Sequence, residues 1–100
     1  MQFGLPDGVV SRLVALLAGN EKISKVRLFG SRAKGNYREG SDIDLCVDAP
    51  DLSLQEKFRL ENAIDDLMLP WKVDVVVMQQ IDNAALLDHI ERVGVRLYER

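Results

Sequence analysis

The stretch "RLFGSRAKGNYREGSDIDLCVD", residues 27–48, departs most clearly from a plain folding pattern. An apolar run ends at Gly30, a short basic loop follows, and two carboxylates, Asp42 and Asp44, then stand inside a strand-like alternation. Residues two apart on a strand point to the same side, so these carboxylates are expected to lie side by side, with Ile43 facing the core. Two such charges about 4 Å apart repel by ~4 kcal/mol at an effective dielectric constant near 20. A bound cation would remove that cost.

A third aspartate strengthens the interpretation of these carboxylates as a metal site. Taken alone, the D-x-D pair is more simply interpreted as two solvated aspartates on the edge of a sheet. Asp74, however, repeats the pattern in the valine-rich strand predicted over 72–78, where a single acidic residue needs a reason. If the two strands are neighbours, three carboxylates converge, and such an all-oxygen site suits Mg²⁺ or Mn²⁺.

The turn at Gly30 and Ser31 is a candidate phosphate-binding element. Glycine lets the backbone come close to a ligand, and the first turn of a helix offers free N–H groups. The Ser31 hydroxyl can bond a phosphate oxygen or simply cap the helix. Arg32 and Lys34 add positive charge in an otherwise acidic chain. Taken alone, such a turn is most often only a cap.

The rest of the chain predicts one α/β domain over residues 1–100. A first amphipathic helix ends near Gly19, and a second begins at the capping box of Ser53 and continues to Pro70. A third begins at Asp82 and ends at Gly94, and "VRLYE", residues 95–99, adds a short final strand. The order of helices and strands indicates a small mixed sheet covered by helices on at least one face.

Composition excludes several classes of protein. The chain has 47% apolar and 29% charged residues, as ordinary globular proteins do, and its net charge of -3 argues against long nucleic acid as the main partner. No secretory signal and no membrane-spanning run is recognisable, which suits the cytoplasm. With one cysteine and one histidine, a disulfide and a zinc site are not expected. Cys46 is expected to be buried filler and His89 to be solvated.

The combined motif resembles a known family. "LFGSRAKG" followed by "SDIDLCV", with a third aspartate on a later strand, resembles the nucleotidyltransferase fold of the DNA polymerase β superfamily, and more closely the minimal nucleotidyltransferase (MNT) group. Lys34 stands where many relatives carry Arg, which preserves the charge. The resemblance covers Val26 to Met78 and, through the "GVRLYE" ending, the whole chain. Such chains often pair with a HEPN-domain protein in toxin–antitoxin modules.

The resemblance implies transfer of a nucleoside monophosphate, AMP from ATP, to an acceptor hydroxyl. Asp42 and Asp44 would bridge two Mg²⁺ ions, for which Mn²⁺ is an alternative. Asp74 would bind the catalytic ion and act as general base or position the nucleophile. The residues that would hold the nucleotide are Gly30, Ser31 and, as a weaker candidate, Arg32.

Two classes of function follow from these expectations. The leading hypothesis is an enzyme that modifies a partner protein, as the antitoxin of a HEPN/MNT pair. The alternative is a binding module that neutralises its partner by contact alone, although such a module has little reason to keep three repelling carboxylates. A small-molecule transferase would need an added substrate domain. The sequence leaves open the NTP, the acceptor and any homo-oligomer.

Overall fold

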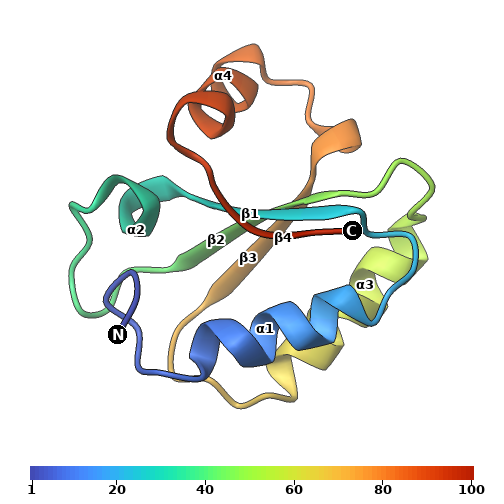
Figure 1. Ribbon diagram of the computed structural model, residues 1–100. Helices are drawn as coiled ribbons and strands as arrows, with labels where there is room; N and C mark the ends of the chain where they lie inside the picture. Colours follow the sequence, from blue (N-terminus) through green and yellow to red (C-terminus); the bar gives the residue numbers. More distant parts are fainter.

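A four-stranded sheet with helices on both faces forms the protein, and the computed structural model describes residues 1–100 (Figure 1). The helices are α1 (Val9–Ala18), α2 (Gly30–Lys34), α3 (Leu54–Asp65) and α4 (Ala84–Val93), with a short 3₁₀ turn, η1 (Met78–Gln80). The strands are β1 (Lys25–Phe29), β2 (Ile43–Asp48), β3 (Val73–Val77) and β4 (Val95–Glu99). The predicted α/β class is therefore confirmed, including the final strand.

Strand pairing makes the sheet mixed. The order is β3-β2-β1-β4, with β1 antiparallel to both β2 and β4. β2 and β3 run parallel, and α3 lies on the crossover between them. β3 and β4 therefore form the two edges, and the two strands that carry the aspartates are neighbours.

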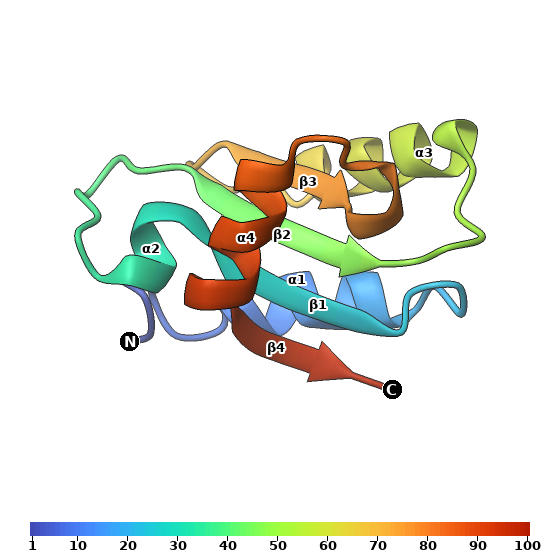
Figure 2. The ribbon, with the colours of Figure 1, turned by 90° about the horizontal axis from the view of Figure 1, so that it is seen from above.

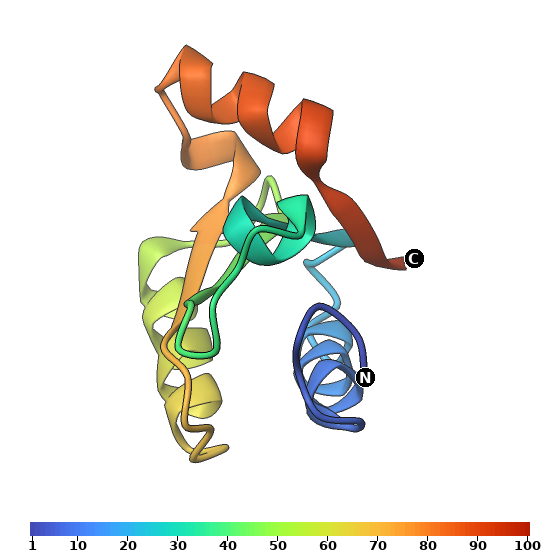
Figure 3. The same ribbon diagram turned by 90° about the vertical axis from the view of Figure 1, so that its left-hand side faces the viewer.

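The two faces of the sheet are covered unequally. α1 and α3 lie side by side on one face, whereas α4 runs across the strands on the other (Figures 2 and 3). The main core of sixteen buried residues lies under α1 and α3, and a smaller cluster of Phe29, Cys46 and Ile90 lies under α4. Cys46 is buried as expected, and burial raises the pKa of its thiol to about 11. The thiol thus remains protonated and unreactive at neutral pH.

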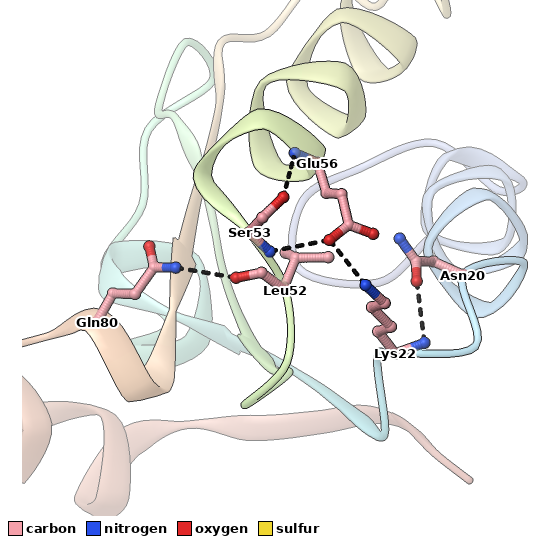
Figure 4. Close-up of polar contacts among 6 residues, drawn as sticks. All are labelled: Asn20, Lys22, Leu52, Ser53, Glu56 and Gln80. Atoms are coloured by element: carbon pink, nitrogen blue, oxygen red, sulfur yellow. Dashed lines mark hydrogen bonds and ion pairs between the residues drawn. The ribbon is translucent and has the colours of Figure 1, made fainter.

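Helix ends follow local side-chain chemistry. The predicted capping box is present, since the Ser53 hydroxyl accepts from the Glu56 N–H and the Glu56 carboxylate accepts from the Ser53 N–H (Figure 4). α3 ends at Asp65 rather than at Pro70, and Met68 has a left-handed conformation with φ of 56° and is exposed. The fourth helix is capped by Asn83, not by Asp82, because the Asn83 side chain accepts the Leu86 N–H.

No helix in the structure combines the length and the apolar character needed to cross a bilayer.

Candidate active site

Two of the three predicted carboxylates stand directly opposite each other on neighbouring strands. Asp44 and Asp74 are register partners in the parallel β2–β3 ladder, so their side chains share one face of the sheet. Asp42 was expected inside this strand, but it lies one residue before β2 and is exposed. The Ile43 N–H donates to the Lys72 carbonyl at 2.9 Å and thereby extends the pairing toward Asp42. We call Asp42, Asp44 and Asp74 the carboxylate row.

The electrostatics of the row centre on Asp44. Partial burial raises the pKa of Asp44, and the negative charges of Asp74 and Asp42 raise it further. The positive charge of Lys72 opposes this shift only in part. Lys72 Nζ lies 3.6 Å from Asp74 Oδ1, but both side chains are well solvated, so the ion pair neutralises little. The row therefore carries uncompensated negative charge.

The geometry of the row fits a cation that takes further ligands from a substrate. No three acidic, histidine or cysteine side chains form a preassembled metal cage. The row is instead open, with Asp44 and Asp74 paired and Asp42 at the margin. Mg²⁺ is commonly bound in this manner, by one or two carboxylates plus water and substrate phosphates, rather than by a complete protein cage.

The Gly-Ser turn lies directly against the row. Gly30 follows the extended Phe29 and is the first residue of α2. Its φ of +76° lies in the left-handed region. A Cβ at this position would overlap Asp44 Oδ2, so only glycine allows the backbone to approach the carboxylate this closely. Half-buried Ser31 follows in the same turn. The structure thus brings the candidate phosphate-binding turn and the candidate metal ligands together.

His89 is a residue of the site that the sequence reasoning missed. Instead of being solvated, it is half-buried, and its Nε2 accepts the Gly30 N–H at 3.3 Å. The ring meets Phe29 edge to face at 6.1 Å between centroids. A phosphate oxygen bound at this turn would therefore compete with His89 Nε2 for the same N–H. The position lies off the apolar stripe of its helix, so periodicity gave no signal of this contact.

Arg32 lies elsewhere than expected. Its side chain is 1% exposed and donates to the carbonyl oxygens of Phe3, Glu39 and Ser41. With its N–H groups used in this way, the guanidinium does not fit the expected role of supplying charge to a bound triphosphate. The reason is burial, which forces a charged group to satisfy its donors inside the protein. The nucleotide-binding expectation now rests on Gly30 and Ser31.

A groove opens beside Asp74, the member of the carboxylate row that lies on the edge strand. It has a volume of about 430 Å³ and lies between α3 and the start of β3. Its lining residues are Glu61, Asn62, Ile64, Asp65, Leu69, Trp71, Lys72, Val73 and Asp74. Trp71 packs against the main core and donates from Nε1 to the Glu39 carbonyl at 3.1 Å. Asp74 is thus reachable from the side of the sheet.

A row of aspartates beside a glycine-started turn is suited to transfer of phosphorus-containing groups, and comparison with known proteins makes the class definite. Residues 11–100 match the family described as polymerase beta, nucleotidyltransferase. The chain belongs to this family and is a nucleotidyltransferase, as the motif predicted. Nucleotidyltransferases generally use divalent metal ions.

Individual relatives include a protein named as an adenylyltransferase and a chain from a toxin-antitoxin structure. The chain is 35% identical over 77 residues to "Putative protein adenylyltransferase MJ1217" of Methanocaldococcus jannaschii, which covers 76% of this chain and 78% of the relative. A solved chain described as a toxin-antitoxin with AMP-PNP is 26% identical, with a TM-score of 0.77 over 92% of this chain and 74% of that one.

A further solved neighbour has the same fold. It comes from a complex of the tri-AMPylated HEPN toxin of Shewanella oneidensis with MNT antitoxin. The match has 22% identity and a TM-score of 0.70, and covers 91% of this chain and 70% of that chain. The predicted resemblance to MNT antitoxins of HEPN toxins is therefore confirmed at the level of family and fold.

Proposed function

We propose that this chain is a metal-dependent protein adenylyltransferase of the cytoplasm that transfers AMP from ATP to a hydroxyl of a HEPN-domain toxin, as the toxin's antitoxin. The observation that carries the proposal is the register pairing of Asp44 with Asp74 beside Gly30. Support for ATP and for a toxin partner comes from relatives named as protein adenylyltransferases and as parts of toxin-antitoxin complexes.

The reaction is a displacement at the α-phosphorus. The acceptor hydroxyl oxygen forms a bond to the α-phosphorus, the bond between this phosphorus and the α,β-bridging oxygen breaks, and pyrophosphate leaves. The hydroxyl proton passes to the Asp74 carboxylate, which acts as general base. Among the three aspartates, Asp74 is suited to this role because it stands at the open edge of the sheet, beside the groove.

Asp42, Asp44 and Asp74 would hold the divalent ions, because their carboxylate oxygens suit Mg²⁺ or Mn²⁺. When bound, Mg²⁺ or Mn²⁺ supplies charge stabilisation for the attacking and leaving oxygens. Gly30 and Ser31 bind the β- and γ-phosphates through the backbone N–H and the side-chain hydroxyl. A phosphate that takes the Gly30 N–H displaces His89 from it.

The acceptor arrives on another folded protein. The carboxylate row opens laterally at an edge strand, where the surface of a partner protein can approach it. A side chain on the surface of a partner, most simply a tyrosine, can reach Asp74 from that side. Addition of AMP to the toxin would place bulk and negative charge on it.

Mass spectrometry of the intact partner tests the proposal. A candidate HEPN-domain toxin is incubated with the chain, ATP and Mg²⁺, and its mass is expected to increase by one or more AMP units. Asp42→Asn is expected to reduce this transfer by at least about 100-fold, a typical loss when a group that stabilises transition-state charge is removed. The matched control is Asp51→Asn, which removes an exposed carboxylate that has no part in the site and should leave the transfer unchanged.

The binding-module alternative gives a different result. In that case the partner is neutralised without any change of mass, and Asp42→Asn neutralises it as well as the wild type does. That pair of results would replace the enzymatic proposal.

A further inference from the structure

Arg32 is the only charged side chain among the fully buried residues, at 1% exposure. A cation is retained inside a protein only when its donors are satisfied. The guanidinium makes four hydrogen bonds to three carbonyl oxygens, at 2.8 Å to Phe3, 3.2 Å to Glu39, and 3.0 and 2.9 Å to Ser41. No carboxylate is among these partners, so all hydrogen bonds of the side chain go to backbone carbonyls and fix the path of the chain around it.

The bonds of Arg32 converge on the segment that leads into the carboxylate row. We call residues 35–42 the site loop. The Ser41 carbonyl receives two of the four bonds, from Nε and Nη2 of the guanidinium. This carbonyl lies in the same rigid peptide plane as the nitrogen and Cα of Asp42. Arg32 therefore orients the backbone at the point where the first aspartate of the row begins.

Two aromatic rings lie near the same guanidinium, one from the site loop and one from the segment before β3. The Tyr37 ring centroid lies 5.3 Å from Arg32 Cζ, and the Trp71 centroid lies 5.9 Å from it. Trp71 also donates from Nε1 to the Glu39 carbonyl of the site loop. Since Trp71 stands three residues before Asp74, the guanidinium and this ring connect the segment before β2 with the segment before β3.

We infer that Arg32 is a positioning residue, which holds the site loop so that Asp42 stands in line with Asp44 and Asp74. The inference rests on the proposed function, because the role of Asp42 in binding the metal–nucleotide complex comes from there. Lysine cannot replace Arg32 in this role, since an ammonium is a point donor without the planar fork that reaches several carbonyls at once.

Tryptic cleavage after residue 38 measures how firmly the site loop is held. Arg32→Lys keeps the charge and the number of tryptic sites, and it is expected to increase the rate of cleavage after Arg38 by at least about tenfold, the factor that corresponds to loss of one charge-assisted hydrogen bond. The matched control is Arg38→Lys, at an exposed position in the same loop. This control should leave the rate of cleavage after residue 38 within about twofold of the wild-type rate. Loss of one charge-assisted hydrogen bond would change the rate by a larger factor. Equal rates in wild type and Arg32→Lys would overturn the inference.

Binding of Mg²⁺·ATP shows whether Arg32 acts through Asp42. In the wild-type background, Arg32→Lys is expected to weaken binding by about tenfold, whereas in the Asp42→Asn background it should weaken binding by less than about twofold, because coupled residues are not additive. An equal loss in both backgrounds would show a general structural effect and contradict the inference. If the wild type does not bind Mg²⁺·ATP, the proposed function fails, while the tryptic measurement still decides whether Arg32 holds the loop.

A second variant covers the case in which Arg32→Lys does not fold, as judged by circular dichroism. Trp71→Phe keeps a ring over the guanidinium but removes the Nε1 donor to Glu39. It is expected to accelerate cleavage after Arg38 by several-fold and to weaken Mg²⁺·ATP binding only when Asp42 is present. Unchanged cleavage in Trp71→Phe, together with an unfolded Arg32→Lys, would assign Arg32 to folding and overturn the positioning role.

Discussion

Asp44 links the stability of the protein to pH. Its pKa is raised above the ordinary value of 3.8 by burial and by the charges of Asp74 and Asp42. The folded state therefore binds this proton more tightly than the unfolded state does. The stabilisation from the protonated form is fully present below pH 3.8 and is lost as the pH rises through the folded-state pKa.

Asp44→Asn is expected to raise the melting temperature of the metal-free protein by a few degrees at pH 7. The variant removes the charged form that the site disfavours. Its advantage over the wild type should shrink as the pH falls through the raised folded-state pKa of Asp44, where the wild-type side chain itself takes up a proton. Added Mg²⁺ should stabilise the wild type and have little effect on the variant, by linkage. Thermal melts with EDTA or Mg²⁺ test both points. A melting temperature of Asp44→Asn below that of the wild type at pH 7 would contradict the prediction. Asp51→Asn is the matched control.

Single residues also mark where prediction from sequence stopped. The carboxylates and the glycine were predictable because their chemistry contradicts the surrounding pattern. Arg32 was not, because a basic residue in a basic loop gives no sign that backbone carbonyls will surround it. His89 was missed because its hydrogen-bond partner, Gly30, lies 59 residues away in the chain.

At the scale of elements, α3 depends on the polar contacts around its first turn. Ser53 and Glu56 cap each other, and Lys22 Nζ, from the loop before β1, lies 2.9 Å from the same Glu56 carboxylate (Figure 4). These hydrogen bonds lower the pKa of Glu56 to about 2. The contribution of the ionised form is therefore present above the ordinary pKa of 4.5 and is lost only as the pH falls toward 2.

Ser53→Ala is expected to destabilise the protein by about 1 kcal/mol, the usual cost of losing an N-cap side chain. In a chain of this size that corresponds to a melting temperature lower by roughly 4–8 °C. Chemical denaturation and a thermal melt measure it. Ser11→Ala, at an exposed position inside α1, is the matched control and should be neutral or slightly stabilising because alanine favours helix interiors. Equal effects of the two substitutions would show that the cap contributes nothing.

Element boundaries were less predictable than the elements themselves. Leu67 and Met68 continue the apolar period of α3, but the chain leaves the helix after Asp65, and Met68 is 85% exposed. The periodic pattern shows which residues are apolar. It does not indicate where the helix must end so that the chain can reach β3. At Asn83 the cap lies one residue later than expected, because Asp82 and Asn83 are equally suitable in sequence and only the path from η1 selects one.

At the scale of the whole molecule, the order of the elements was evident in the sequence, whereas the order of the strands was not. Nothing local states that β1 lies in the centre with β4 on its far side. That arrangement comes from pairing between segments that are distant in sequence. The loop-closure entropy that such pairing costs is repaid only when the complete core forms. The active site follows from it, since the row exists only where β2 and β3 lie in parallel register.

The position of β3 at the margin of the sheet also bears on solubility. One side of this strand has no hydrogen-bonding partner strand, and four of its five residues are valine, which makes it a template for association with other chains. The negative charge of Asp74 opposes such stacking, because two copies that paired here would bring like charges together. Asp74→Asn is therefore expected to self-associate at high concentration, as measured by light scattering, whereas Asp74→Glu should remain monodisperse. Equal scattering by the two variants would show that this carboxylate has no part in keeping the molecules apart.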